Sequence, residues 1–238
     1  MSPLAFAVAA ALGNIVGALA VVRRERRSLR VIDACLAFGA GFMLAVALLG
    51  VMPEVLRDSP SAALYVLAGY LAVHLAQHVV TPHFHFGEET HRVTASAGFS
   101  ALLGLTLHTF FDGVAIASGF LVSRHLGVLL FLAVLLHKLP EGVTIASVMV
   151  AGGQGRGRAL GAAGVLGAAT VLGVLMTEHV GPLARHGLAL SAGVTLYVAA
   201  SNLVPEFQGK RGGLTAAAFF GGALAFFAAE RLLEVWVP

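Results

Sequence analysis

Eight stretches of about twenty mostly apolar residues divide this chain, and they constrain its fold more than any other feature. A helix needs about 20 such residues to cross a bilayer. No alternating strand pattern is present, so we predict an all-α membrane protein, 1–238, with eight transmembrane helices joined by loops. The predicted spans are 4–22, 31–53, 61–80, 97–121, 125–150, 159–178, 187–207 and 213–235.

The composition agrees with a chain immersed in lipid. Charged residues make up 11% of it and hydrophobic residues 58%, whereas a soluble domain carries about 25% charged residues. These proportions argue against a soluble enzyme or a nucleic-acid-binding protein. Ten of the 15 Lys and Arg residues fall in the loops after spans 1, 3, 5 and 7. The positive-inside rule therefore places those loops in the cytoplasm and both termini outside, with a bacterial inner (plasma) membrane as the expected location.

Two pairs of segments repeat along the chain. Residues 107–118 and 136–147 are identical at seven of twelve positions, and residues 40–54 and 192–206 at seven of fifteen. The two members of each pair are predicted to cross the membrane in opposite directions. We therefore expect inverted repeats that relate spans 1–3 to spans 6–8 and span 4 to span 5. Such repeats are typical of transporters with a midplane site and alternating access.

A histidine and a carboxylate stand four residues apart near the middle of span 4 and again of span 5. His108 and Asp112 share one helix face, as do His137 and Glu141. Charged groups at mid-membrane cost about 3 kcal/mol each and persist where they pair or hold an ion. Two imidazoles and two carboxylates suit Zn²⁺, with Fe²⁺, Mn²⁺ or Cd²⁺ as alternatives. We therefore predict a site for a metal ion as transported substrate, with no organic cofactor.

Proline and glycine residues adjoin these candidate ligands. Pro140 is expected to break the helix before Glu141 and to turn the Leu136 carbonyl toward the site. Gly113 and Gly142 each follow a carboxylate, and we expect them to let the two helices approach each other.

Further side chains suggest an entrance and an exit for cations. The candidates are Glu54 at the outer mouth, Glu206 at the inner mouth, and His74, His78, His83, His85 and His91 in or beside the cytoplasmic loop 81–96. Solvated side chains at the membrane interface are the alternative interpretation of all of them.

The two midspan motifs resemble those of a known family. His108-Thr-Phe-Phe-Asp112-Gly113 and His137-Lys-Leu-Pro140-Glu141-Gly142 are similar to the span-4 and span-5 signatures of the ZIP (Zrt/Irt-like) divalent metal transporters. The resemblance covers the whole chain. It implies a 3+2+3 arrangement of spans, uptake of zinc or a related cation into the cytoplasm by an elevator-like or rocking motion, and a homodimer.

The resemblance also assigns individual residues. The four midspan side chains match the primary site of the family, and Met43 matches a position where some members place a thioether ligand. A packing role is the alternative interpretation of Met43.

The chain departs from the family pattern where other members build a second metal site. Thr109 stands where many members have Asn, Lys138 stands where they have an acid, and the only acid of span 6 is Glu178 at its outer end. We hypothesise a mononuclear site in which the Lys138 ammonium replaces the second cation as counter-charge. On span 7, Ser201 and Asn202 replace His or acidic residues, and Asn202 is a candidate for the exit route.

Two other functions remain open at this stage. An intramembrane metal-dependent hydrolase can activate water with similar ligands, although the chain has no HExxH motif and no separate general base. A membrane protein that binds metal without transporting it is the other alternative, because Lys138 can abolish transport rather than tune it. Symmetric halves favour a transporter, so we expect a protein that is not an enzyme and whose partners are a metal ion and the lipid bilayer.

Overall fold

The computed structural model describes residues 2–23, 29–58, 61–80, 95–205 and 213–236, and every regular element within these ranges is helical. The elements are α1 (Pro3–Val22), α2 (Leu29–Ala45), η1 (Val46–Val51), α3 (Met52–Asp58), α4 (Ala62–Leu75), η2 (Ala76–Val80), α5 (Ala95–Val122), α6 (Arg124–Ala151), α7 (Arg156–His179), α8 (Gly181–Tyr197), η3 (Val198–Leu203) and α10 (Gly213–Trp236). The three η elements are π-helical turns that continue the preceding helix.

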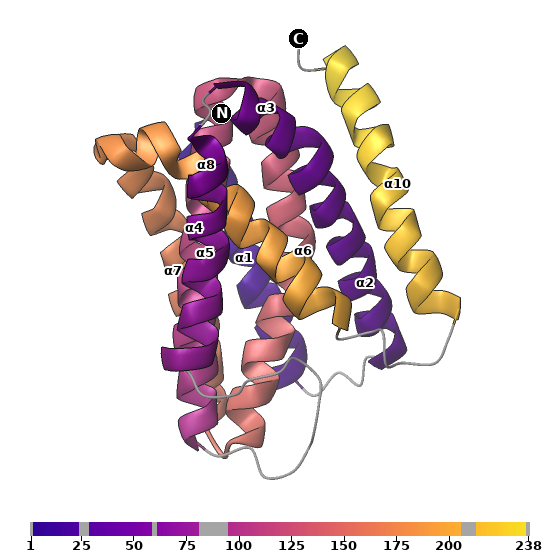
Figure 1. The fold of residues 1–238 in the computed structure, drawn as a ribbon. Helices are drawn as coiled ribbons and strands as arrows, with labels where there is room; N and C mark the ends of the chain where they lie inside the picture. The colour runs from indigo at the N-terminus through magenta and orange to yellow at the C-terminus, as the bar shows by residue number, and fades with distance from the viewer. Residues whose placement is uncertain (1, 24–28, 59–60, 81–94, 206–212, 237–238) are drawn as a thin grey trace.

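Six helical segments of the described chain are long and apolar enough to cross a membrane. They are Pro3–Val22, Asp33–Arg57, Ala101–Val122, Arg124–Ala151, Arg156–His179 and Gly213–Val235, and they coincide with six of the eight predicted spans. The other two predicted spans, 61–80 and 187–207, contain α4 and α8 and are not among the six, so the count of eight stays a prediction. The start of α1 and the end of α10 lie at the same end of the bundle (Figure 1).

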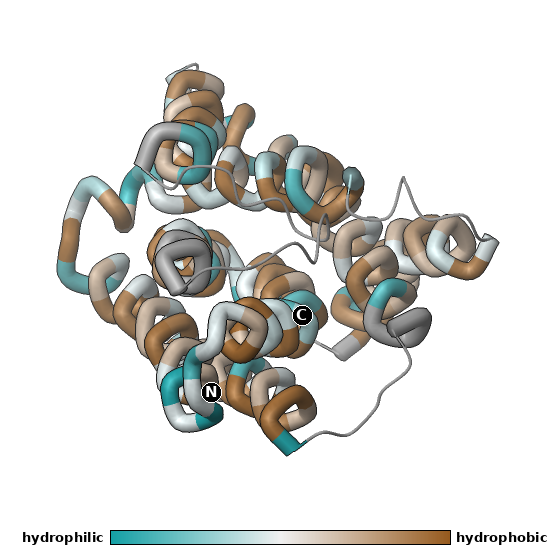
Figure 2. The backbone as a smooth tube through the Cα atoms, turned by 90° about the horizontal axis from the view of Figure 1, so that it is seen from below, coloured by the Kyte–Doolittle hydropathy of each residue, from teal (hydrophilic) through white to brown (hydrophobic). Residues whose placement is uncertain are grey.

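Hydrophobic residues occur all along the helices, as the hydropathy colouring of the backbone shows (Figure 2), and many large ones are exposed. On α4, Leu64 is 68% exposed and Leu71 50%, and on α10 Leu224 is 67% exposed. Contiguous exposed apolar surface is unusual on a soluble protein and is what a lipid environment requires. The structure therefore supports an integral membrane protein.

The two helices that carry the candidate ligands, α5 and α6, lie at the centre of the helix packing. Helices α1, α5, α6 and α7 form one set of neighbours, while α2 packs on α10 and α4 packs on α8. Contacts of α5 with α8 and of α6 with α2 join the first set to the two pairs. The centre of the molecule is therefore screened from lipid by its own helices.

Four helix pairs approach until their backbones touch at glycines. In each pair, a Cβ atom added to either glycine would overlap a carbonyl oxygen of the other helix, and such close approach requires small residues. Gly17 and Gly142 join α1 to α6, Gly113 and Gly173 join α5 to α7, Gly41 and Gly222 join α2 to α10, and Gly69 and Gly193 join α4 to α8. The expectation that Gly113 and Gly142 bring α5 and α6 together is wrong, because these glycines contact α7 and α1.

Two expectations about Pro140 are also wrong, namely the helix break and the turning of the Leu136 carbonyl toward the site. Helix α6 continues through Pro140 without a break, and the Leu136 carbonyl oxygen lies 3.6 Å from the position of a Cβ on Gly39, so it faces α2. Helix α8 begins at Gly181, before the predicted start of the span 187–207. Pro182 fits there because the N–H groups of a first helical turn have no partner within the helix.

Candidate metal centre

The four predicted ligands meet between α5 and α6. One ligand atom from each of His108, Asp112, His137 and Glu141 lies within 4.8 Å of all the others. Each residue occupies the middle of its helix, and the four side chains are buried, with exposed fractions of 2% to 6%. The i, i+4 spacing aligns each pair on one helix face, and the packing of α5 on α6 turns the two faces toward each other.

Lys138 connects the two carboxylates of this centre. Its Nζ donates to Asp112 Oδ2 at 2.7 Å and to Glu141 Oε2 at 2.8 Å, and the side chain is completely buried. A buried charge is tolerated when it is paired and hydrogen-bonded. The ammonium of Lys138 thus neutralises one of the two negative charges of Asp112 and Glu141 from within the centre.

The hydrogen bonds of His137 select its tautomer. Its Nδ1 lies 2.9 Å from the carbonyl oxygen of Ala133, and a carbonyl only accepts, so Nδ1 carries the proton. Its Nε2 lies 3.2 Å from Asp112 Oδ2, within hydrogen-bond distance of the carboxylate. A backbone carbonyl that orients the second ring nitrogen is typical of a metal-binding histidine.

Parts of the centre have no hydrogen-bond partner among the described residues. They are Glu141 Oε1 and His108 Nδ1, while His108 Nε2 lies 3.4 Å from Asp112 Oδ2. A buried acceptor left unpaired costs about 1–3 kcal/mol. The unpaired Glu141 oxygen is therefore a coordination position that a metal ion can fill.

Thr109 and Met43 are both buried. The Thr109 hydroxyl donates to the carbonyls of Leu105 and Thr106, at 3.0 Å each, within its own helix. Met43 is 1% exposed and belongs to the apolar cluster that α2 shares with α4, α6, α8 and α10. The role of both side chains toward a metal ion therefore stays a prediction.

A cavity extends from the centre toward the π turns that follow α4 and α8. His108, His137 and Glu141 line one part of it, and Gln77 of η2 and Asn202 of η3 line another. The prediction that Asn202 lies near the route of the ion is compatible with this position, whereas Gln77 was not anticipated from the sequence.

The remaining candidates lie apart from the centre or outside the described residues. His74 and His78 are exposed, with stacked rings 4.2 Å apart, and His78 Nδ1 donates to the His74 carbonyl at 3.0 Å. Glu54 pairs with Arg57 at 3.1 Å. Four candidates lie outside the described residues: His83, His85, His91 and Glu206.

Sequence reasoning also missed Asn14 of α1. This residue is completely buried against α6, where a Cβ on Gly142 would overlap its carbonyl oxygen. A signal was available, because Asn14 is the only polar side chain between Pro3 and Val22.

Comparison with known proteins gives a consistent result. A family model described as ZIP zinc transporter matches residues 87–230, which include the whole centre. Zinc transporter ZIP13 of Pongo abelii is 26% identical over 194 residues, covering 72% of this chain and 57% of the relative. Zinc transporter ZIP9 of Micropogonias undulatus is 33% identical over 156 residues, covering 59% and 50%, and ZIP9-A of Xenopus laevis is 30% identical over 155 residues, covering 59% and 51%.

The chain spans about half the length of the curated relatives it matches. The family model nevertheless covers more than half of this chain, and the matched part carries both midspan motifs. The chain belongs to the ZIP zinc transporter family.

Proposed function

We propose that this chain is a secondary transporter that moves a divalent transition metal, zinc foremost, across the membrane into the cytoplasm. The observation that carries the proposal is the convergence of His108, Asp112, His137 and Glu141 inside the helix bundle. A nitrogen and carboxylate donor set without thiolate suits Zn²⁺ and still permits release, and Fe²⁺, Mn²⁺ and Cd²⁺ are alternative substrates.

The helix contacts support alternating access between inverted repeats. The glycine contact of α1 with α6 has a counterpart in that of α5 with α7, and the contact of α2 with α10 has one in that of α4 with α8. The predicted repeats relate α1 to α7, α2 to α8, α4 to α10 and α5 to α6. Exchanging the helices in this way converts each contact into its counterpart. We propose eight spans in the 3+2+3 arrangement, with the ion held between the repeats.

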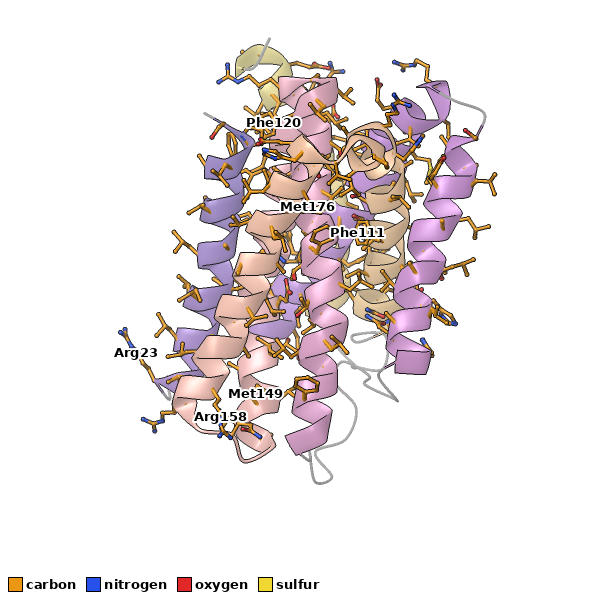
Figure 3. The ribbon with its side chains drawn as sticks, turned by 90° about the vertical axis from the view of Figure 1, so that its left-hand side faces the viewer. Arg23, Phe111, Phe120, Met149, Arg158 and Met176 are labelled. Carbon is orange, nitrogen blue, oxygen red and sulfur yellow. The ribbon has the colours of Figure 1, made fainter. Side chains whose placement is uncertain are left out.

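The cavity supports an exit toward the cytoplasm. It lies on the side of the centre that faces Gln77 and Asn202. Arg23 at the end of α1 and Arg158 at the start of α7 lie together at one end of the bundle, as expected for a cytoplasmic side (Figure 3). We propose that the ion leaves past Asn202 toward His74 and His78, then toward the loop histidines and Glu206, and that Glu54 serves the outer mouth.

Lys138 supports a mononuclear site. An ammonium bonded to both carboxylates occupies the electrostatic position of a second cation, and Glu141 Oε1 stays available to the substrate. We propose one metal ion per chain, with Met43 as an additional thioether ligand. We further propose a homodimer in a plasma (inner) membrane, with both termini outside.

Metal uptake by reconstituted liposomes tests the transport proposal. Wild-type protein is expected to accumulate radioactive zinc, and His108→Ala, Asp112→Ala, His137→Ala and Glu141→Ala are expected to lose most of this flux. Unlabelled Fe²⁺, Mn²⁺ and Cd²⁺ as competitors rank the substrates. Uptake that survives all four substitutions contradicts the proposal.

The same assay addresses the alternatives. Family members are transporters, which argues against the hydrolase interpretation. The two ion pairs of Lys138 are the observation that favours a metal-binding protein without transport, because the ammonium competes for the carboxylates. Stoichiometric zinc binding without flux would support that alternative.

A further inference from the structure

The amide group of Asn14 lies inside the helix bundle with no hydrogen-bond partner among the residues that the structure describes. Its side chain is completely buried, and neither Oδ1 nor Nδ2 has a hydrogen-bond partner among the described residues. Burying an amide whose hydrogen bonds to water are not replaced costs free energy in a protein interior. An amide kept at this cost points to a partner that arrives in another state of the molecule.

Asn14 lies against the turn of α6 that carries the charged residues. A Cβ on Gly142 would overlap the Asn14 carbonyl oxygen, and a Cβ on Gly13 would lie 3.0 Å from the Lys138 Cβ. The base of the Lys138 side chain therefore rests on α1 beside Asn14. From there its flexible four-carbon stem leads to the carboxylates.

Arrival of a dication reverses the charge of the centre. Asp112, Glu141 and Lys138 together carry one net negative charge, and a dication changes this to one net positive charge. Like charges repel strongly in a medium of low dielectric constant. The carboxylates and imidazoles are the proposed ligands, so Lys138 is the charged group that can give up its bonds to the carboxylates while its charge stays within the centre.

We propose that Asn14 is a positioning residue whose Oδ1 accepts the Lys138 ammonium when a dication occupies the carboxylates. This inference rests on the proposed function. Among the described residues, buried side-chain oxygens without a partner occur at Asn14, Ser118 and Glu141. Glu141 is a proposed ligand, and Ser118 lies beside Gly187 of α8. Asn14 is the one that directly follows Gly13, the α1 residue that meets the Lys138 Cβ.

A double-mutant cycle tests the coupling, with zinc affinity of the purified full chain as the measurement. Asn14→Leu removes the acceptor at similar side-chain volume. A hydrogen bond to a charged group contributes about 1.5–3 kcal/mol, so we expect zinc affinity to fall about tenfold or more when Lys138 is present. In a Lys138→Met background, the same substitution is expected to change affinity less than about twofold. Equal losses in both backgrounds indicate a purely structural role and overturn the proposal.

Two further variants separate the acceptor from packing. Asn14→Asp keeps an acceptor oxygen and is expected to bind zinc at least as tightly as wild type; binding as weak as that of Asn14→Leu contradicts the proposal. Thr170→Val is the matched control. The Thr170 carbonyl meets Gly113 as that of Asn14 meets Gly142, but its hydroxyl donates to the Leu166 carbonyl at 3.4 Å. Zinc affinity is expected to stay unchanged in this control.

His108→Ala distinguishes failure of this inference from failure of the proposed function. If zinc binding survives His108→Ala, the metal centre itself is wrong. If His108→Ala abolishes binding while Asn14→Leu has the same effect with and without Lys138, only the role of Asn14 is wrong. Size-exclusion profiles and thermal midpoints of all variants establish that each protein is folded.

Discussion

The half-sites on α5 and α6 contain the same two ligand types at the same spacing. The residue that follows the histidine, however, makes different contacts in each. On α5, the Thr109 hydroxyl bonds to carbonyls of its own helix. On α6, Lys138 reaches across to Asp112 as well as along its helix to Glu141. The comparison teaches that similar helical frames can hold an asymmetric charge distribution, because one side chain decides where the positive charge lies.

The largest effect on zinc affinity is expected from the two carboxylates, which differ in how many partners they have. Asp112 Oδ2 lies within 3.4 Å of Lys138 and both imidazoles, whereas the described ion pair of Glu141 is with Lys138. Removing one partner of a buried charge pair costs about 2–5 kcal/mol. We expect Asp112→Asn to weaken zinc binding about 100-fold or more and Glu141→Gln to weaken it less, measured by calorimetric titration. A larger loss of zinc affinity in Glu141→Gln than in Asp112→Asn would contradict the central role given to Asp112.

The next effect concerns the glycines that follow the carboxylates. Gly113→Ala and Gly142→Ala place a Cβ on the Thr170 and Asn14 carbonyls. Overpacking costs about 1–3 kcal/mol, so both variants are expected to lower the thermal midpoint of the purified protein. The control is Gly161→Ala on α7, where an added Cβ meets no atom within 4 Å. Equal stability of all three variants would contradict the backbone contacts.

Lys138→Glu tests the origin of the asymmetry. An acid at this position resembles the family pattern and removes the built-in positive charge. We expect a titration to show two zinc ions per chain instead of one, roughly a doubling of stoichiometry, because three carboxylates favour a second dication. An unchanged ratio of one to one would falsify the counter-charge hypothesis.

The smallest effect is expected on the α5 side. Thr109→Val removes a hydroxyl whose described bonds stay within its own helix, so zinc affinity is expected to remain within about twofold of wild type. The free energy of unfolding is expected to fall by about 1 kcal/mol. Both quantities follow from one titration and one denaturation series. A zinc affinity reduced as strongly as in Asp112→Asn would make Thr109 a ligand and remove the contrast with Lys138.

Helical periodicity explains which parts of the site were predictable. The i, i+4 spacing of His108 with Asp112, and of His137 with Glu141, places each pair on one face of any α-helix. Six of the apolar runs likewise became long helices at nearly the predicted positions. These inferences succeeded because they depend on one helix at a time.

Contacts between helices were harder to predict. The sequence motif suggested that Gly113 and Gly142 join α5 to α6, yet they contact α7 and α1. It also suggested a break at Pro140 that α6 does not have, and it gave no warning that α1 meets Lys138 at Gly13, next to Asn14 in the chain. Each of these facts depends on which helices become neighbours.

Hydropathy and residue spacing alone indicated a membrane-embedded helical chain with two matched pairs of nitrogen and oxygen ligands. The packing of the helices added that Lys138 bridges the carboxylates, that the Asn14 amide has no hydrogen-bond partner among the described residues, and that a cavity leads to Gln77 and Asn202. The physical reason is that lipid and protein offer similar apolar surroundings to a helix. Hydropathy therefore predicts which segments enter the membrane, while close packing at small residues and polar contacts select the neighbours.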